Sequence, residues 1–204
     1  MPTTSHHFFA YLARMKLIDR WSLMRCTQRE NVQEHSLQVA IIAHALCLIK
    51  NKYFGGELSP DSVALRAIFH DATEVLTGDL PTPVKYFNPE IRQAYNAIED
   101  HAVEQLMKLL PDEFKDNYRG LLSIGTSRVE VEMKAMIKAA DTLSAYIKCQ
   151  EEEAAGNHEF SRAKKSIEAK LEVLKARPEV AYFMQHFAPS FALTLDELSS
   201  PLEL

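Results

Sequence analysis

Apolar residues recur at intervals of three and four along most of this chain, the spacing of one face of an α-helix. Between residues 31 and 50, for example, Val39, Ile42 and Leu46 share a face with His35. The same period returns in five other segments, separated by residues that favour turns. The pattern predicts an all-α fold, with helices over residues 8–18, 31–50, 59–77, 89–110, 128–155 and 158–176.

The segment 31–50 is predicted to be central and largely buried, because Leu37, Ile41 and Leu48 make its second face apolar as well. Its start is marked by Asn31 and, three residues later, Glu34, which together form a capping box. His35 therefore falls in the first turn of the helix.

The predicted helix 59–77 has its own boundary signals. Ser59 is a suitable N-cap and Pro60 suits the first helical position, while Gly78 can end the helix. A loop stiffened by prolines follows over residues 79–88.

Composition narrows the class of protein. The 204 residues can bury a substantial core, and we interpret residues 1–204 as one domain. A net charge of −5 argues against binding of nucleic-acid polymers. Three widely spaced cysteines, no signal-like amino terminus and no apolar run of membrane-spanning length predict a cytoplasmic protein without membrane association.

The dipeptide His70-Asp71 lies inside an apolar helical pattern, where an uncompensated carboxylate costs several kcal/mol. His35 and Asp141 lie in two other predicted helices, so a bundle can bring the four side chains together. Two imidazoles and two carboxylates suit a divalent transition metal and leave positions open for water and substrate. Taken alone, His35 would instead be a hydrogen-bonded core histidine.

Residues near this dipeptide are candidates for further roles. Glu74 follows His70 by one helical turn on the same face, where a general acid or base could stand beside the metal. Asp79, Thr82 and Lys85 lie in the following loop and are candidate substrate contacts, the alternative being a rigid turn with solvated polar groups.

Two other polar segments are open to plainer interpretations. Arg20 precedes Trp21, the only tryptophan, and an isolated pair of this kind would be a core tryptophan beside a solvated arginine. Next to a metal site, the same arginine could bind phosphate. The acidic run at residues 151–153 is predicted to be a solvated helix end.

These motifs together resemble the HD-domain phosphohydrolases, and within that superfamily the bacterial 5′-deoxynucleotidases. The order of His35, His70-Asp71 and Asp141 carries the resemblance to the superfamily. The Arg20-Trp21 pair and the long run over residues 77–87 carry the more specific one. The likeness also covers the segments 18–21, 30–40, 70–87, 138–141 and 189–191.

The resemblance implies hydrolysis of a deoxyribonucleoside 5′-monophosphate to the deoxynucleoside and phosphate, with one cobalt, manganese or copper ion and a homodimeric protein. Arg20 would orient the phosphate, Trp21 would contact the sugar and exclude a ribose 2′-hydroxyl, and Glu74 or Asp79 would manage protons. The implied metal ligands are His35, His70, Asp71 and Asp141. The implied substrate pocket comprises Arg20, Trp21, His35, Asp71, Asp79, Leu80, Pro81, Thr82 and Asp141.

Two other functions are compatible with the motifs. The same metal site could hydrolyse a cyclic or pyrophosphorylated nucleotide, although the chain lacks a recognisable second set of histidines for a dinuclear phosphodiesterase. A helical interaction module with a structural metal is the non-enzymatic alternative. The open ligand set and the neighbouring arginine favour an enzyme.

Overall fold

The structure is a computed structural model that describes residues 5–85, 87–123 and 125–199. Within these ranges the regular elements are all helices, so the predicted all-α fold is confirmed; Asp19 and Asn31 form one isolated β-bridge. The elements are α1 (Phe8–Leu12), the 3₁₀ helix η1 (Ala13–Leu17), α2 (Val32–Tyr53), α3 (Pro60–Ile68), α4 (Glu74–Thr77), α5 (Thr82–Lys85), α6 (Pro89–Lys108), α7 (Asp112–Leu122), α8 (Arg128–Ala154), η2 (His158–Phe160), α9 (Ser161–Leu174), α10 (Pro178–His186), η3 (Ala188–Ala192) and α11 (Leu195–Ser199).

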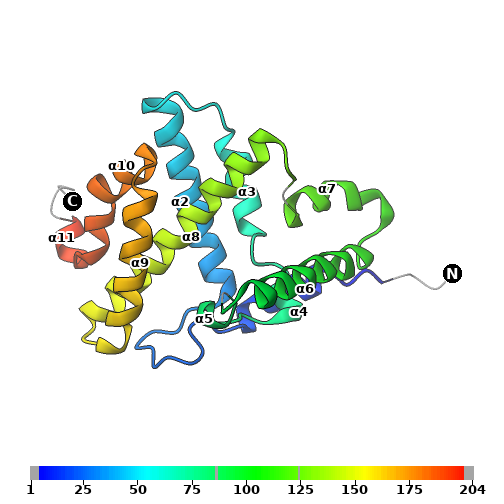
Figure 1. Ribbon diagram of the computed structural model, residues 1–204, viewed down its shortest axis with the longest axis horizontal. Coiled ribbons are helices and arrows are strands. Elements are labelled where there is room, and N and C mark those ends of the chain that lie inside the picture. The colour runs from blue at the N-terminus through cyan, green and yellow to red at the C-terminus, as the bar shows by residue number, and fades with distance from the viewer. Residues whose placement is uncertain (1–4, 86, 124, 200–204) are drawn as a thin grey trace.

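Helices α2 and α8 form the centre of the molecule (Figure 1). Their apolar faces meet in a core that includes Leu46 and Leu143, and α3, α9 and α10 complete that core. A smaller cluster joins Phe8 of α1 to Leu106 and Met107 of α6. Helix α4 packs on η1 and α6, so the chain between α3 and α4 passes from the large core to the small one.

Helix α2 begins as predicted, with Asn31 and Glu34 forming both bonds of the capping box. By length and composition α2 is apolar enough to cross a membrane, with a mean hydropathy of 1.3, so the prediction that no run approaches that length was wrong. Because 56% of the window is buried in the protein, the same signal fits a core helix.

One face of α2 is less buried than its apolar pattern predicted. Leu37, Ile41 and Leu48 are 58%, 62% and 48% exposed, and they succeed one another along the helix. The opposite face, which includes Val39 and Leu46, is fully buried. Helix α2 therefore has one face in the core and one apolar face on the surface.

The predicted continuous helix over residues 59–77 was wrong in its middle. Ser59 caps α3 as expected, but α3 ends at Ile68, and residues 69–73 form tight turns before α4. The carbonyl of Ala67 accepts bonds from both the backbone N–H and the ring of His70, so it does not continue the α-helical ladder. Gly78, with φ of 72°, ends α4 as predicted.

The acidic end of α8 also departs from the prediction. Glu151 is exposed, as expected of a solvated helix end, but the side chain of Glu152 is only 1% exposed. Its carboxylate accepts hydrogen bonds from Thr27, in the segment that precedes α2. The sequence could not reveal this partner, because 125 residues separate the two.

Candidate active site

His35 is held in one orientation by two polar neighbours. Its side chain is fully buried, and its Nδ1 lies 3.2 Å from the Oγ of Ser144 on α8. Ser144 donates its own hydrogen to Gln38 Oε1, at 2.6 Å, so its oxygen accepts the Nδ1 proton of His35. The Nε2 atom has no hydrogen-bond partner in the described part of the chain, so its lone pair is available to a ligand.

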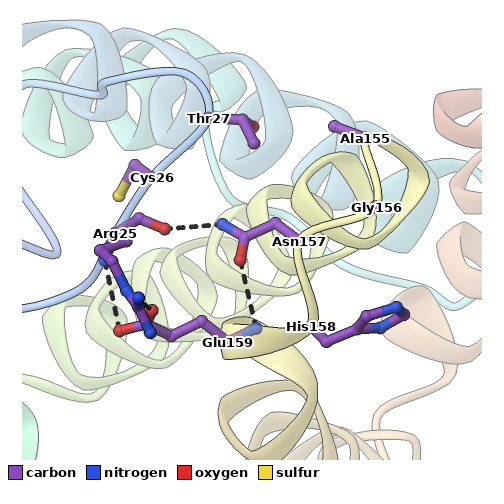
Figure 2. A pocket seen from close by; sticks show the side chains of 8 residues that line it. All are labelled: Arg25, Cys26, Thr27, Ala155, Gly156, Asn157, His158 and Glu159. Carbon is purple, nitrogen blue, oxygen red and sulfur yellow. Dashed lines mark hydrogen bonds and ion pairs between the residues drawn. The ribbon is translucent and has the colours of Figure 1, made fainter.

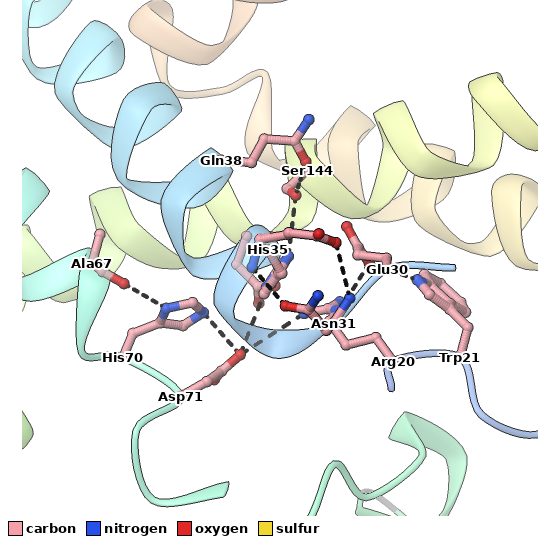
Figure 3. Close-up of polar contacts among 12 residues, drawn as sticks. Arg20, Trp21, Glu30, Asn31, His35, Gln38, Ala67, His70, Asp71 and Ser144 are labelled. Atoms are coloured by element: carbon pink, nitrogen blue, oxygen red, sulfur yellow. Dashed lines mark hydrogen bonds and ion pairs between the residues drawn. The ribbon is translucent and has the colours of Figure 1, made fainter. Parts of the chain in front are cut away.

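His70 is oriented in the same way by the turn that contains it. Its Nδ1 donates to the carbonyl of Ala67 at 2.7 Å, which leaves Nε2 facing Asp71 Oδ2 at 3.1 Å (Figure 3). The break between α3 and α4 thus gives both His70 and Asp71 access to the same point. A continuous helix would have directed their side chains about 100° apart.

The three segments converge on one small volume. His35 Nε2 lies 3.6 Å from Asp71 Oδ2 and 3.3 Å from Asp141 Oδ1. One ligand atom each from His35, His70 and Asp71 lies within 4.8 Å of the others. Two imidazole nitrogens without hydrogen-bond partners, facing carboxylates, are what a divalent transition metal requires. The residues present therefore fit such an ion.

Three of these four groups are in the protonation state that metal binding requires. The exception is His70: burial opposes its protonation, but the charges of Asp71 and Asp141 raise its pKa, so a metal ion would displace a proton there. Burial lowers the pKa of His35, which keeps its imidazole neutral. Burial opposes ionisation of Asp71, but the adjacent His70 holds the pKa of Asp71 well below its usual value. Burial likewise opposes ionisation of Asp141, but His35 and Lys138 hold its pKa low. Both carboxylates are therefore charged at neutral pH.

Glu74 has the opposite electrostatic environment. It is only 7% exposed, and its Oε2 has no hydrogen-bond partner among the described residues. Burial, followed by the negative charges of Asp71 and Asp79, raises the pKa of Glu74 to about 9. Burial also raises the pKa of Asp79. Glu74 therefore favours its protonated form beside the ionised carboxylate of Asp71.

Arg20 and Trp21 lie in the segment 18–31, which we call the strap. Its ends pair antiparallel, with Arg20 N–H donating to the Glu30 carbonyl at 2.9 Å and Val32 N–H donating to Ile18 at 3.0 Å. Within the strap, Glu30 Oε2 accepts from Trp21 Nε1 at 3.2 Å and lies 3.1 Å from Arg20 Nε (Figure 3). One carboxylate therefore positions both residues.

The two residues are arranged differently from the plainer interpretation of a core tryptophan beside a solvated arginine. The side chain of Arg20 is only 13% exposed, and its Nη1 lies 3.8 Å from Asp71 Oδ2. Trp21 is half-buried, has a φ of 56° and packs on Phe160 with ring centroids 5.3 Å apart. A positive φ is rare for a bulky residue, so the backbone of the strap is strained at Trp21.

The predicted pocket residues after α4 form a short loop and the start of α5. Asp79, Leu80 and Pro81 are half-buried, whereas Thr82 is exposed. The Pro81 carbonyl accepts the backbone N–H groups of Val84 and Lys85, which closes the turn of α5. This loop follows α4, and Asp79 lies close enough to interact electrostatically with Arg20, Asp71 and His35.

Lys85, a candidate substrate contact, has two partners within the protein. Its Nζ donates to Glu99 at 2.9 Å and lies 4.2 Å from the ring centroid of Tyr95. Both partners belong to α6, so the amine ties α5 to that helix.

Some polar residues around the site were not found from the sequence. Ser144 follows Asp141 by one helical turn, so the spacing of α8 contained a usable signal for it. Gln38 follows His35 by the same interval. Glu30 gave no such signal, because its partners depend on the antiparallel pairing of the strap ends.

The sequence was compared with models of known protein families. The model described as "5′-deoxynucleotidase YfbR-like" matches residues 7–191. The chain belongs to the YfbR-like 5′-deoxynucleotidase family.

Curated relatives of this YfbR-like chain match it over nearly its whole length. A 5′-deoxynucleotidase of Vibrio cholerae is 55% identical over 193 residues, covering 95% of this chain and 98% of that protein. The 5′-deoxynucleotidase YfbR of Salmonella paratyphi B is 55% identical over 198 residues, covering 96% and 98%.

Solved structures agree on the fold of this YfbR-like chain. An HD-domain phosphohydrolase from Listeria innocua superposes with a TM-score of 0.77 at 25% identity, covering 96% of this chain and 94% of that one. The HD phosphohydrolase of cyanophage S-2L, bound to dA and one catalytic Zn²⁺ ion, has a TM-score of 0.60 at 18% identity, covering 89% and 96%. The resemblance to the HD phosphohydrolase fold and to the 5′-deoxynucleotidases is therefore confirmed.

Proposed function

We propose that this chain hydrolyses deoxyribonucleoside 5′-monophosphates to the deoxynucleoside and inorganic phosphate. The observation that carries the proposal is the convergence of His35, His70 and Asp71 beside a buried arginine, in a chain of the YfbR-like family. Ligands with open positions and a forked cation suit a phosphate ester.

One divalent ion would be held by His35, His70, Asp71 and Asp141. Of these, His35, Asp71 and Asp141 would also border the substrate. When bound, such an ion polarises a phosphate oxygen and lowers the pKa of a bound water. We propose cobalt, manganese or copper as the activating ions, with cobalt expected to be effective in vitro. Zinc is added to the test because the cyanophage protein binds it.

Arg20 binds and orients the phosphate in this proposal. Its guanidinium is buried and lies 3.8 Å from Asp71, so a phosphate near the ligands falls within its reach. Glu30 pairs with the Nε atom of the Arg20 guanidinium. The terminal nitrogens are thus left to bind the non-bridging oxygens of the substrate phosphate.

Trp21 contacts the sugar, and Asp79, Leu80, Pro81 and Thr82 complete the nucleotide pocket. Glu30 and Phe160 fix the large, rigid indole, which supports its proposed role of excluding a hydroxyl at the 2′ position. Selection for deoxyribose therefore comes from exclusion of the ribose hydroxyl.

Glu74 handles the proton that the leaving deoxynucleoside needs. Burial and the charges of Asp71 and Asp79 raise the pKa of its carboxyl, which favours the protonated form, so Glu74 can deliver a proton to the departing 5′ oxygen. Asp79, whose pKa burial also raises, is the second carboxyl group in the same region.

The proposal is tested by phosphate release from matched deoxyribo- and ribonucleoside 5′-monophosphates. Metal-stripped protein is restored separately with cobalt, manganese, copper, zinc and magnesium. We expect metal-dependent release from the deoxy substrates alone. Release from cyclic or pyrophosphorylated nucleotides instead would favour the other hydrolase, whereas metal binding without any hydrolysis would favour an interaction module.

Two variants separate metal binding from phosphate binding. Asp71→Asn removes a ligand charge, so we expect loss of bound metal and of activity with an unchanged helical circular dichroism spectrum. Arg20→Ala should retain the metal but lower kcat/KM by roughly 100-fold or more, since a charged hydrogen bond at the reacting group is lost. Arg29→Ala, a change at an 86% exposed arginine of the strap, is the matched control. Full metal content in Asp71→Asn would refute the ligand assignment.

We also propose a homodimer and a cytoplasmic location. The exposed apolar face of α2, formed by Leu37, Ile41 and Leu48, is the surface that a second copy would cover. Cys47 and Cys149 are buried free thiols, which suits a reducing compartment. Light scattering of the wild type and of Ile41→Lys tests the dimer, and a monomeric wild type would refute it.

A further inference from the structure

The strap is fastened to α8 by Glu152, which lies about three helical turns after Asp141. The carboxylate of Glu152 is 1% exposed, and its Oε2 accepts the backbone N–H of Thr27 at 2.8 Å and the Thr27 hydroxyl at 2.7 Å. Its Oε1 accepts the backbone N–H of Gln28 at 3.3 Å. One buried carboxylate therefore holds two consecutive residues of the strap.

Lys148, one helical turn before Glu152 on α8, binds the same part of the strap. We call Glu152, Lys148, Thr27 and Gln28 together the joint. Its side chain is 5% exposed, and its Nζ donates to Glu152 Oε1 at 2.6 Å and to the Gln28 carbonyl at 2.5 Å. The buried ion pair thus satisfies both polar groups of the Gln28 backbone. A buried pair with its remaining hydrogen-bonding positions filled fixes geometry strongly.

The turn after α8 holds the neighbouring part of the strap. Asn157 Nδ2 donates to the Arg25 carbonyl at 2.6 Å and to Glu152 at 2.8 Å, and Arg25 pairs with Glu159 at 2.6 Å (Figure 2). Arg25, Asn157 and Glu159 are among the residues that line the pocket seen in Figure 2.

The joint and the ligand group share one face of α8. Asp141, Ser144, Lys148 and Glu152 follow one another at intervals of three, four and four residues, which places them in one row along the helix. Asp141 is a proposed ligand and Ser144 orients His35, whereas Lys148 and Glu152 belong to the joint.

The joint is also connected to the indole ring of Trp21. Phe160, at the turn held by Asn157, is fully buried and packs on Trp21. The Trp21 carbonyl accepts the backbone N–H of Met24 at 2.8 Å, which leaves a short connection to Thr27. Movement at Thr27 would therefore be transmitted to Trp21.

We propose that Glu152 is a positioning residue for nucleotide binding, which fixes the strap so that Trp21 and Arg20 face the ligand group. The proposal rests on the proposed function for its kinetic consequence, and on the contacts of Glu152 for its structural one. Glu152 acts through the strap and does not touch the substrate.

Glutamine cannot replace Glu152 at this position. Each bonded group around its two oxygens is a donor: Thr27, Gln28 and Asn157 donate through N–H or O–H, as does Lys148. Whichever way a glutamine amide is oriented, its NH₂ group faces donors. Glu152→Gln therefore releases the strap while keeping nearly the same volume in the core.

The test compares Glu152→Gln with Glu151→Gln, which removes the same charge at the exposed neighbouring position. Trp21 is the only tryptophan, so its fluorescence reports the strap without any substrate. In Glu152→Gln we expect red-shifted emission and stronger acrylamide quenching, with unchanged metal content. We expect KM for the deoxynucleotide to rise about tenfold, and kcat to stay within about twofold, because binding geometry is lost while the ligand group is kept. Glu151→Gln should match the wild type.

Thr27→Val provides the second variant, because it removes one bond from the strap side and leaves α8 unaltered. It should shift fluorescence and KM in the same direction by a smaller amount, and it decides the test alone if Glu152→Gln does not fold. Wild-type fluorescence and KM in the folded variants would overturn the proposal, as would a loss of kcat at constant KM. If the wild type hydrolyses no deoxynucleotide, the proposed function fails, whereas the fluorescence comparison still decides whether Glu152 positions Trp21.

Discussion

Each imidazole at the site has its Nδ1 atom committed to a group of the protein. Ala67 supplies a backbone carbonyl to His70, whereas His35 depends on the hydroxyl of Ser144. Such bonds fix the tautomer that presents Nε2 to a metal and increase the basicity of the ligand. The orientation of His35 is therefore the one at this site that a single side-chain change can release.

We predict that Ser144→Ala lowers metal affinity about 10- to 100-fold, because the His35 ring loses the partner that orients it. Titration of metal-stripped protein by calorimetry measures this directly. Ser36→Ala is the matched control, since Ser36 is also buried next to His35 but has no hydrogen-bond partner among the described residues. Equal affinities for the two variants would contradict the role of Ser144.

Among single residues, the sequence identified as site candidates those whose chemical type is unusual for their apolar surroundings. A histidine and an aspartate within apolar helices led to His35 and His70-Asp71, which the structure brings together. Glu30 and Glu152 were missed because a glutamate near a helix end is ordinary in a sequence. Only their distant partners make them distinctive.

Among the elements, the ends of helices were predictable and the break between α3 and α4 was not. Caps are local, so Asn31, Ser59 and Gly78 could be recognised from a few neighbouring residues. The break depends on the ring of His70 binding the Ala67 carbonyl, a choice that apolar spacing does not encode. The strap likewise has no periodicity, because its order comes from contacts with α8 and α2.

Helix α10 is fastened to α2 and α8 by a second charged cluster. Glu179 is 1% exposed and accepts from Arg177 Nε at 2.8 Å, while Lys50 and Arg177 both bind Glu132. Removing one member leaves its partners partly buried without a counter-charge.

We predict that Glu179→Ala lowers the free energy of unfolding by about 3–5 kcal/mol, the usual effect of breaking a buried ion pair. Urea titration of the metal-free protein gives the value. Glu172→Ala, at a 69% exposed surface pair with Lys175, should change it by less than about 1 kcal/mol. A similar loss in both variants would show that burial of Glu179 is unimportant.

For the molecule as a whole, the joint between the strap and α8 makes stability depend on pH. Burial opposes ionisation of Glu152, but Lys148, Thr27 and Asn157 hold its pKa well below the ordinary value. In the unfolded chain the same carboxyl has a pKa of about 4.3. The ionised group therefore stabilises the fold above that pH, and its contribution is lost as the pH falls towards the folded-state pKa.

We predict that wild type and Glu152→Gln differ in unfolding free energy by about 2 kcal/mol at pH 7, as expected for bonds to a buried charge. The difference should shrink between pH 5 and pH 3, and chemical denaturation at each pH measures it. Glu151→Gln should not lose stability relative to the wild type at any of these pH values, because burial raises the pKa of Glu151 instead of lowering it. A gap that grows on acidification would contradict the assigned pKa.

The row of polar residues along α8 has a consequence for the timing of maturation. A chain emerging from the ribosome presents His35, His70 and Asp71 long before Asp141, Ser144 and Glu152 are synthesised. Until then the His35 ring lacks its Ser144 partner and the strap lacks its attachment to α8. Translation of this one late helix therefore supplies the partner of the His35 ring and the attachment of the strap at the same time.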